Sequence, residues 1–140
     1  MPDSATNLTL VVGYDGSDGS RRALLRVHEL AIHYRALVIV AVVPDIRSAG
    51  LGADLAGSRI DPERLLGEAR ELLDGGQGAA IETRAAVGDP AVVLTEVARE
   101  VGAQLLIVGR RGGDFVTRTL LGSVAERVVQ AAPCDVLVVA

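Results

Sequence analysis

Short runs of aliphatic residues alternate along the chain with longer segments of helical periodicity, and this alternation restricts the folds that the chain can adopt. Runs of Val, Leu, Ile and Ala are separated by segments whose apolar residues recur every three or four positions. A regular β–α alternation is typical of a parallel sheet whose crossover helices pack on both faces. The sequence therefore predicts an α/β fold, a Rossmann-like three-layer sandwich.

The bounds of the predicted elements follow from the apolar runs and the turn residues between them. Strands are predicted at Leu8–Val12, Leu37–Val43, Ala80–Val87, Leu105–Val108 and Val136–Val139. Helices are predicted at Ser17–Tyr34, from Asp61 to the Gly75-Gly76 pair, at Val92–Val101 and at Ser123–Ala131. The second run is uninterrupted, which favours a strand buried on both faces. The alternating Glu82 and Arg84 favour a more exposed position for the third strand.

Two Asp-Pro pairs mark helix starts. At Asp61-Pro62 and at Asp89-Pro90, the aspartate suits the N-cap position and the proline suits the first helical position. We therefore expect the second and third helices to begin at these pairs.

The length of the chain fits one domain spanning residues 1–140. Residues 1–7 are polar and are expected to be flexible, and residues 44–60, rich in Gly, Ala, Ser and Asp, are expected to form a mobile loop. The start has no basic and apolar regions like those of a secretory signal, and no apolar run has the length of a membrane span. We therefore expect a cytoplasmic protein that does not enter a membrane.

Composition excludes several classes of function. A net charge of −4, a single Phe and no Trp disfavour nucleic-acid binding, which uses positive charge and aromatic stacking. Every basic side chain is arginine, so the lysine of a P-loop and Schiff-base chemistry are both excluded. Cys134 is the only cysteine, which excludes an internal disulfide and a cysteine-based metal site.

A glycine-rich segment, Gly109–Ser123, follows the fourth predicted strand. Its fixed points are Gly109, Gly112, Gly122 and Ser123, in the spacing G-x2-G-x9-G-S. The first two glycines allow a tight turn and a close approach of the backbone to a ligand. The Gly-Ser pair lies at the start of a helix, where free N–H groups and the helix dipole favour an anion. An alternative is that Ser123 and Glu126 form only a capping box and that the glycines only end a strand.

The chain resembles the universal stress protein family, and specifically its ATP-binding branch, from Leu8 to Ala140. The residues that carry the resemblance are VVGYDGS at 11–17, VAVVP at 40–44, VGDP at 87–90, LIVGRRG at 106–112 and LLGSVAERVVQAAPCDVLVV at 120–139. The resemblance implies a five-stranded parallel sheet in the order 3-2-1-4-5. It also implies that ATP is bound, with Mg²⁺ carried by the phosphates.

The resemblance assigns roles to residues that match the family pattern. Asp15 is placed against the adenosine end of the nucleotide, and the backbone of Val42 against the adenine ring. The other matching residues are placed near the ribose and phosphates: Gly109, Gly112, Gly122, Ser123 and Val124. Arg110, at a variable position between the first two glycines, is a further binding candidate. Asp15 is equally well explained as a turn or cap residue before Ser17. Arg110, Arg111, Arg118 and Arg127 each either screen phosphate charge or are simply hydrated.

The sequence offers no evident catalyst. The two histidines, His28 and His33, fall within the first predicted helix, and Asp114 is the one acid inside the glycine-rich segment. We therefore expect an ATP-dependent stress-response or regulatory module with little or no hydrolysis, acting on an unidentified protein partner. A slow ATP hydrolase and a nucleotide-free interaction module remain as alternatives. The last strand, Val136–Val139, carries no charge that would discourage edge pairing, so a homodimer through this strand is expected.

Overall fold

The computed structural model describes residues 8–33, 36–42, 61–73, 79–110 and 121–140. The strands in these residues are β1 (Leu8–Tyr14), β2 (Ala36–Val42), β3 (Ala79–Ala85), β4 (Leu105–Gly109) and β5 (Asp135–Val139). The helices are α1 (Asp18–His33), α4 (Pro62–Leu73), α5 (Pro90–Val101) and α6 (Ser123–Ala131). The predicted flexible start, residues 1–7, and the predicted loop, residues 44–60, lie outside the described residues.

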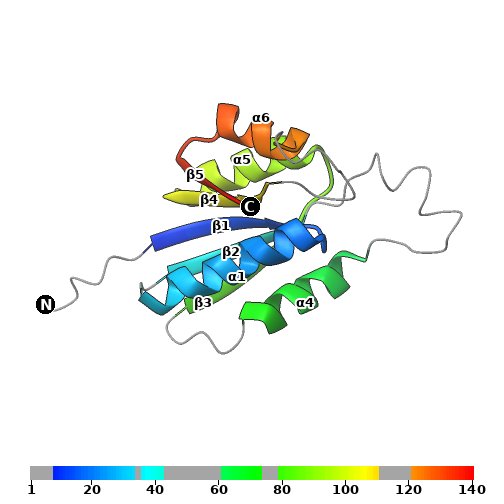
Figure 1. The fold of residues 1–140 in the computed structure, drawn as a ribbon, viewed down its shortest axis with the longest axis vertical. Helices are drawn as coiled ribbons and strands as arrows, with labels where there is room; N and C mark the ends of the chain where they lie inside the picture. The colour runs from blue at the N-terminus through cyan, green and yellow to red at the C-terminus, as the bar shows by residue number, and fades with distance from the viewer. Residues whose placement is uncertain (1–7, 34–35, 43–60, 74–78, 111–120) are drawn as a thin grey trace, which may run out of the picture.

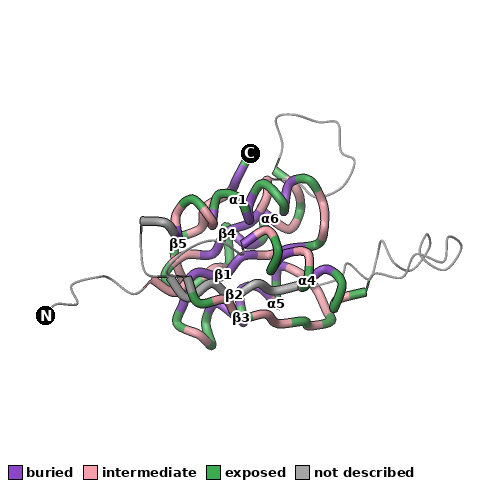
Figure 2. Tube along the Cα trace, turned by 90° about the horizontal axis from the view of Figure 1, so that it is seen from below, coloured by how far each residue is buried: buried purple, intermediate pink, exposed green. Residues whose placement is uncertain are grey.

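The strands form one parallel sheet in the order β3-β2-β1-β4-β5. In β1, at the centre, successive side chains point to opposite faces, so Leu10 and Val12 contribute to one core layer and Val11 to the other. The first layer lies between the sheet and the pair α1 and α4, and the second lies between the sheet and the pair α5 and α6. Helices therefore cover both faces (Figure 1), as the β–α alternation predicts. Figure 2 shows the buried residues gathered where these layers meet.

Several element bounds differ from the prediction by one or two residues. Strand β1 continues past Gly13 because Gly13 and Tyr14 stay in the ladder with Ala41 and Val42 of β2. A side chain at Gly13 would meet Leu94 at 2.9 Å, so the glycine serves helix packing and does not end the strand. Strand β3 ends earlier than predicted, at Ala85. It lies at the edge of the sheet, and Glu82 is exposed, as its sequence predicts. The burial of the β2 side chains lies outside the described residues.

Both predicted Asp-Pro helix starts are present. Asp61 accepts a hydrogen bond at Oδ1 from the N–H of Glu63 (3.1 Å) at the start of α4. Asp89 caps α5 by accepting hydrogen bonds at Oδ1 from the N–H groups of Ala91 (3.0 Å) and Val92 (3.4 Å). These caps form because aspartate reaches forward to N–H groups that the first helical turn leaves unpaired.

The end of β4 lies directly against the start of α1. A Cβ built on Gly109 would lie 2.6 Å from both the carbonyl carbon and the oxygen of Gly19, and 3.0 Å from the Ser20 nitrogen. All three atoms belong to the backbone, which cannot move aside as a flexible side chain can. Gly109 is therefore required for close packing between this strand and this helix.

We expect Gly109→Ala to lower the free energy of unfolding by about 1–3 kcal/mol, because the added methyl group forces the strand and helix apart. Gly67→Ala is the matched control, since nothing lies within 4 Å of a Cβ built at that position in α4. The control should raise stability by about 0.5–1 kcal/mol. Urea unfolding followed by circular dichroism measures both values. Equal stabilities for the Gly109→Ala protein and the wild type would contradict the packing.

Candidate functional site

The candidate site lies at the carboxyl edge of the sheet, where parallel strands all end. Strand β1 is followed by Asp15, β2 ends at Val42 and β4 ends at Gly109. Tyr14 and Val42 are paired in the ladder, so Asp15, the next residue after Tyr14, lies beside the end of β2. The structure thus brings three of the predicted site residues, Asp15, Val42 and Gly109, to one edge of the sheet.

Backbone hydrogen bonds join the two ends of the glycine-rich segment. The Arg110 N–H donates to the Val139 carbonyl (2.7 Å), which continues the β4–β5 ladder by one residue. The Arg110 carbonyl then accepts a hydrogen bond from the Gly122 N–H (2.8 Å). Gly109 and the Gly122-Ser123 pair are therefore neighbours at the end of β4. Gly112 and the rest of residues 111–120 lie outside the described residues, with Arg111, Asp114 and Arg118 among them.

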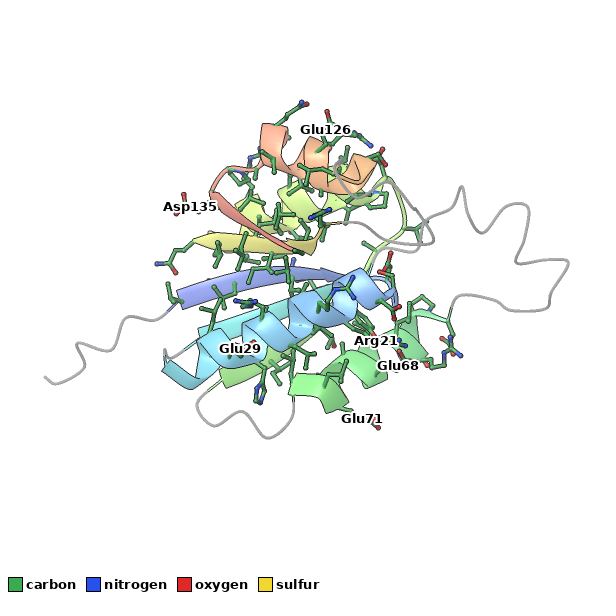
Figure 3. All side chains as sticks on the ribbon, in the orientation of Figure 1. Arg21, Glu29, Glu68, Glu71, Glu126 and Asp135 are labelled. Atoms are coloured by element: carbon green, nitrogen blue, oxygen red, sulfur yellow. The ribbon has the colours of Figure 1, made fainter. Side chains whose placement is uncertain are left out.

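The N-terminus of α6 differs from the capping-box alternative. The N-cap residue is Gly122, with extended backbone angles (φ −63°, ψ 158°), and in the part of the chain that the structure describes no side chain caps the helix there. The prediction of Ser123 as N-cap is wrong, since Ser123 is the first helical residue and is exposed. Glu126 donates its N–H to the Gly122 carbonyl (2.9 Å), and its side chain is exposed (Figure 3).

This cap leaves the first turn of α6 suited to an anion. A helix begins with N–H groups that have no partner inside the helix, and a serine or aspartate N-cap usually satisfies one of them. Glycine has no side-chain oxygen, so Gly122 itself satisfies none of these N–H groups, and they share the N-terminus with the positive end of the helix dipole. Ser123 and Val124 lie in this turn.

Asp15 belongs to a hydrogen-bonded turn at the start of α1. Its Oδ1 accepts hydrogen bonds from the Ser17 N–H (2.9 Å) and from the hydroxyl of the buried Ser20 (2.9 Å). Gly16 between them has a positive φ of 83°, which a side chain would disfavour. The turn interpretation of Asp15 is therefore correct for one carboxylate oxygen. The residue itself is exposed at the carboxyl edge.

The histidines lie away from this edge. Helix α1 starts at the carboxyl edge and runs back along the sheet, so His28 is roughly 15 Å from the first helical residue at 1.5 Å per residue. His33 is the last residue of α1 and lies farther still. Neither histidine is placed to act at the candidate site. In the part of the chain that the structure describes, no group of three or more His, Cys, Asp or Glu residues is arranged to hold a metal ion.

Comparison with known proteins settles the family. The universal stress protein family model matches residues 7–140. The chain belongs to the universal stress protein family.

Individual relatives cover nearly the whole chain. Universal stress protein Rv1636 of Mycobacterium tuberculosis is 37% identical over 139 residues, which are 94% of each chain. Universal stress protein MJ0531 of Methanocaldococcus jannaschii is 36% identical over 137 residues, covering 93% of this chain and 80% of its own.

Solved structures have the same fold. A universal stress protein in complex with cAMP is 36% identical, with a TM-score of 0.72 and coverage of 94% of this chain and 95% of the other. Universal stress protein UspA from Lactobacillus plantarum has a TM-score of 0.76 at 21% identity, covering 95% and 97% of the two chains, which shows the shared fold.

A buried tyrosine links the end of β1 to α4 in this universal stress protein, and the sequence pattern does not reveal the link. Tyr14 is 2% exposed and donates its hydroxyl to Oε1 of Glu68 (2.9 Å). Arg21 of α1 lies 3.9 Å from the same carboxylate, and Figure 3 shows the two side chains meeting between the helices. Burial, followed by the bond to Glu68, raises the pKa of Tyr14 above its usual value near 10. These contacts hold α4 beside the residue that precedes Asp15.

A second unpredicted contact resolves the role of Arg127. Its Nη1 lies 2.7 Å from Oδ2 of Asp89, the residue that caps α5. The bond to Arg127 lowers the pKa of Asp89, and the hydrogen bonds from Val92 and Ala91 act in the same direction. Arg127 is thus engaged by a carboxylate on the neighbouring helix. Arg110 is half-buried where β4 ends, and its backbone holds both ends of the glycine-rich segment.

We expect Tyr14→Phe to lower the free energy of unfolding by about 1 kcal/mol, because the hydrogen bond to Glu68 is lost while the ring stays buried. The raised pKa means that the neutral phenol is favoured in the folded state, so its stabilising effect is full below about pH 10 and is lost as the pH rises through the folded-state pKa. The variant should therefore lose less stability than the wild type above pH 10. Denaturant unfolding as a function of pH measures the difference. Identical alkaline profiles would contradict the assignment.

Proposed function

We propose that this universal stress protein binds ATP at the carboxyl edge of its sheet and acts as a nucleotide-dependent regulatory module in the stress response. The observation that carries the proposal is the Gly122–Arg110 backbone hydrogen bond of 2.8 Å, which sets the glycine-capped start of α6 beside the end of β4. The first-turn N–H groups supply an anion site without a lysine, which this chain lacks. The 36% identical universal stress protein in complex with cAMP supports an adenine nucleotide as the ligand class.

In this proposal the nucleotide lies across the ends of β2, β1 and β4. The backbone at Val42 contacts the adenine, and the other carboxylate oxygen of Asp15, Oδ2, accepts hydrogen bonds from the adenosine end. The ribose and phosphates lie along the segment that begins at Gly109 and Arg110 and includes Gly112. The phosphates lie against Gly122 and meet the first-turn N–H groups of α6 at Ser123 and Val124, while the Gly122 N–H stays bonded to the Arg110 carbonyl. Mg²⁺ arrives with the phosphates.

In this proposal the protein acts through the binding of ATP and not through its hydrolysis. The described residues at the edge include no histidine, and the serines of the turn after β1, Ser17 and Ser20, hydrogen-bond with each other and with Asp15. ATP binding then changes the surface offered to a protein partner. Hydrolysis of ATP at several turnovers per second by the purified protein would contradict this part of the proposal.

The cAMP complex of a relative makes cAMP the second candidate ligand. A cyclic monophosphate carries a single negative charge, whereas ATP carries several. Added negative charge at the start of α6 should therefore penalise ATP much more than cAMP.

We expect Ser123→Asp to weaken ATP binding at least tenfold, since close like charges at this edge cost more than about 1.4 kcal/mol. The same change should not destabilise the fold, because an acid in the first turn suits the helix dipole. Gln104→Glu is the matched control. It adds the same charge at the opposite edge of the sheet and keeps an acceptor for the Thr9 N–H, which Gln104 Oε1 now accepts at 2.8 Å.

Isothermal titration calorimetry with ATP and with cAMP measures these affinities. Loss of ATP affinity in Ser123→Asp alone supports the proposal. A similar small loss for both ligands would mean that the extra phosphates of ATP do not lie at the start of α6, and would contradict this placement. No heat with either ligand in the wild type would favour a nucleotide-free interaction module and would overturn the proposed function.

We also propose a homodimer formed by antiparallel pairing of β5. This strand pairs only with β4 within the described sheet, so its outer edge carries free backbone groups. Residues 136–139 are all aliphatic, and the only charge on β5 is Asp135 at its start. Sedimentation equilibrium at micromolar concentration should give twice the mass of the chain, and a monomer would contradict the pairing.

A further inference from the structure

The position of α6 depends on a few directional contacts. The helix has nine residues, and its apolar face contributes the buried Ala125 and Val128 to the core. Apolar packing selects the face that α6 buries, and hydrogen bonds and ion pairs add fixed points to the position of the helix. Two such contacts join α6 to other elements among the described residues: the Gly122–Arg110 hydrogen bond at the N-terminus and the ion pair between Arg127 and Asp89.

The ion pair is short and shares its carboxylate with a helix cap. Arg127 Nη1 lies 2.7 Å from Asp89 Oδ2, while Oδ1 of the same aspartate accepts the N–H groups of Ala91 and Val92. Asp89 is therefore fixed by α5 before it binds Arg127. A carboxylate held in this way offers the guanidinium one defined position. The side chains are 45% and 33% exposed, so the expected contribution to global stability is small.

Arg127 lies four residues after Ser123, on the same side of the helix and one turn away. A constraint on Arg127 therefore also constrains the first turn. We infer that Arg127 is a positioning residue for the phosphate site: its ion pair with Asp89 holds the start of α6 in the place where its N–H groups meet the nucleotide. This inference rests on the proposed binding of ATP.

Two substitutions separate positioning from simple attraction of phosphate by the arginine. Asp89→Asn keeps an N-cap of similar strength and removes the negative charge that engages Arg127. If Arg127 acted only through its positive charge, freeing it would strengthen ATP binding. If it acts by positioning, Asp89→Asn weakens ATP binding, and so does Arg127→Met, which keeps most of the side-chain volume.

The control is a second ion pair that also involves α5. Arg84 Nη1 of β3 lies 3.2 Å from Oε2 of Glu100, near the C-terminal end of α5, and both side chains are exposed. Arg84→Met and Glu100→Gln remove this pair with the same changes in charge. They test whether any loss of surface charge alters nucleotide affinity.

Calorimetry with ATP on the full chain measures the effect. We expect Kd to rise about two- to fivefold in both Arg127→Met and Asp89→Asn. The double variant should have a Kd for ATP no higher than that of the weaker-binding single variant, because both substitutions remove the same ion pair. The Arg84 and Glu100 variants should leave Kd unchanged. Tighter binding in Asp89→Asn, or additive losses in the double variant, would overturn the inference.

Amide hydrogen exchange without nucleotide gives a second readout. The hydrogen-bonded amides at the start of α6, the Gly122 N–H on the Arg110 carbonyl and the Glu126 N–H on the Gly122 carbonyl, should exchange faster in Arg127→Met and in Asp89→Asn than in the wild type, and not in Arg84→Met. Unchanged exchange would contradict positioning even if ATP affinity fell. If the wild type binds no ATP, the proposed function fails and the phosphate-site role fails with it. If the wild type binds ATP and these variants match the control, only the inference about Arg127 fails.

Discussion

One backbone hydrogen bond, from the Gly122 N–H to the Arg110 carbonyl, sets the geometry of the carboxyl edge in this universal stress protein. The Arg110 carbonyl is fixed in turn, because the Arg110 N–H extends the ladder to Val139. The start of α6 is thereby tied to the sheet and not only to the segment that precedes the helix. An anion at the N–H groups of α6 and a base near Val42 would therefore lie on the same rigid frame.

Glycine serves two different purposes at this edge. At Gly122 it caps α6 without a side-chain oxygen, so the first turn remains suited to an anion. At Gly109 it allows the backbone of β4 to touch the backbone of α1 at Gly19. The G-x2-G-x9-G-S pattern therefore contains at least one glycine that the fold itself requires. Loss of binding after substitution of Gly109 would not separate a ligand contact from a packing defect, whereas a change at Ser123 would.

Local features of the sequence predicted local structure well. The β–α alternation, the Asp61 and Asp89 caps and most element bounds depend on neighbours a few residues away, and the structure contains them. The capping-box interpretation, with Ser123 as N-cap of α6, is wrong. The start of this helix is bonded to Arg110, twelve residues before Gly122, and a short motif does not encode such a contact. The Tyr14–Glu68 and Arg127–Asp89 contacts join residues 54 and 38 positions apart, so they could not be predicted from spacing. Gly112, Asp114 and the 44–60 segment remain predictions.

The central claim is that the N–H groups at the start of α6 bind the phosphates of ATP. An NMR titration of the isotope-labelled protein with ATP tests it most directly, since amide resonances report on each N–H separately. The account predicts that the largest shifts occur at Gly122, Ser123 and Val124, with a second group near Val42 and Asp15. Shifts confined to the opposite edge, around Thr9 and Gln104, or no shifts at millimolar ATP would contradict it.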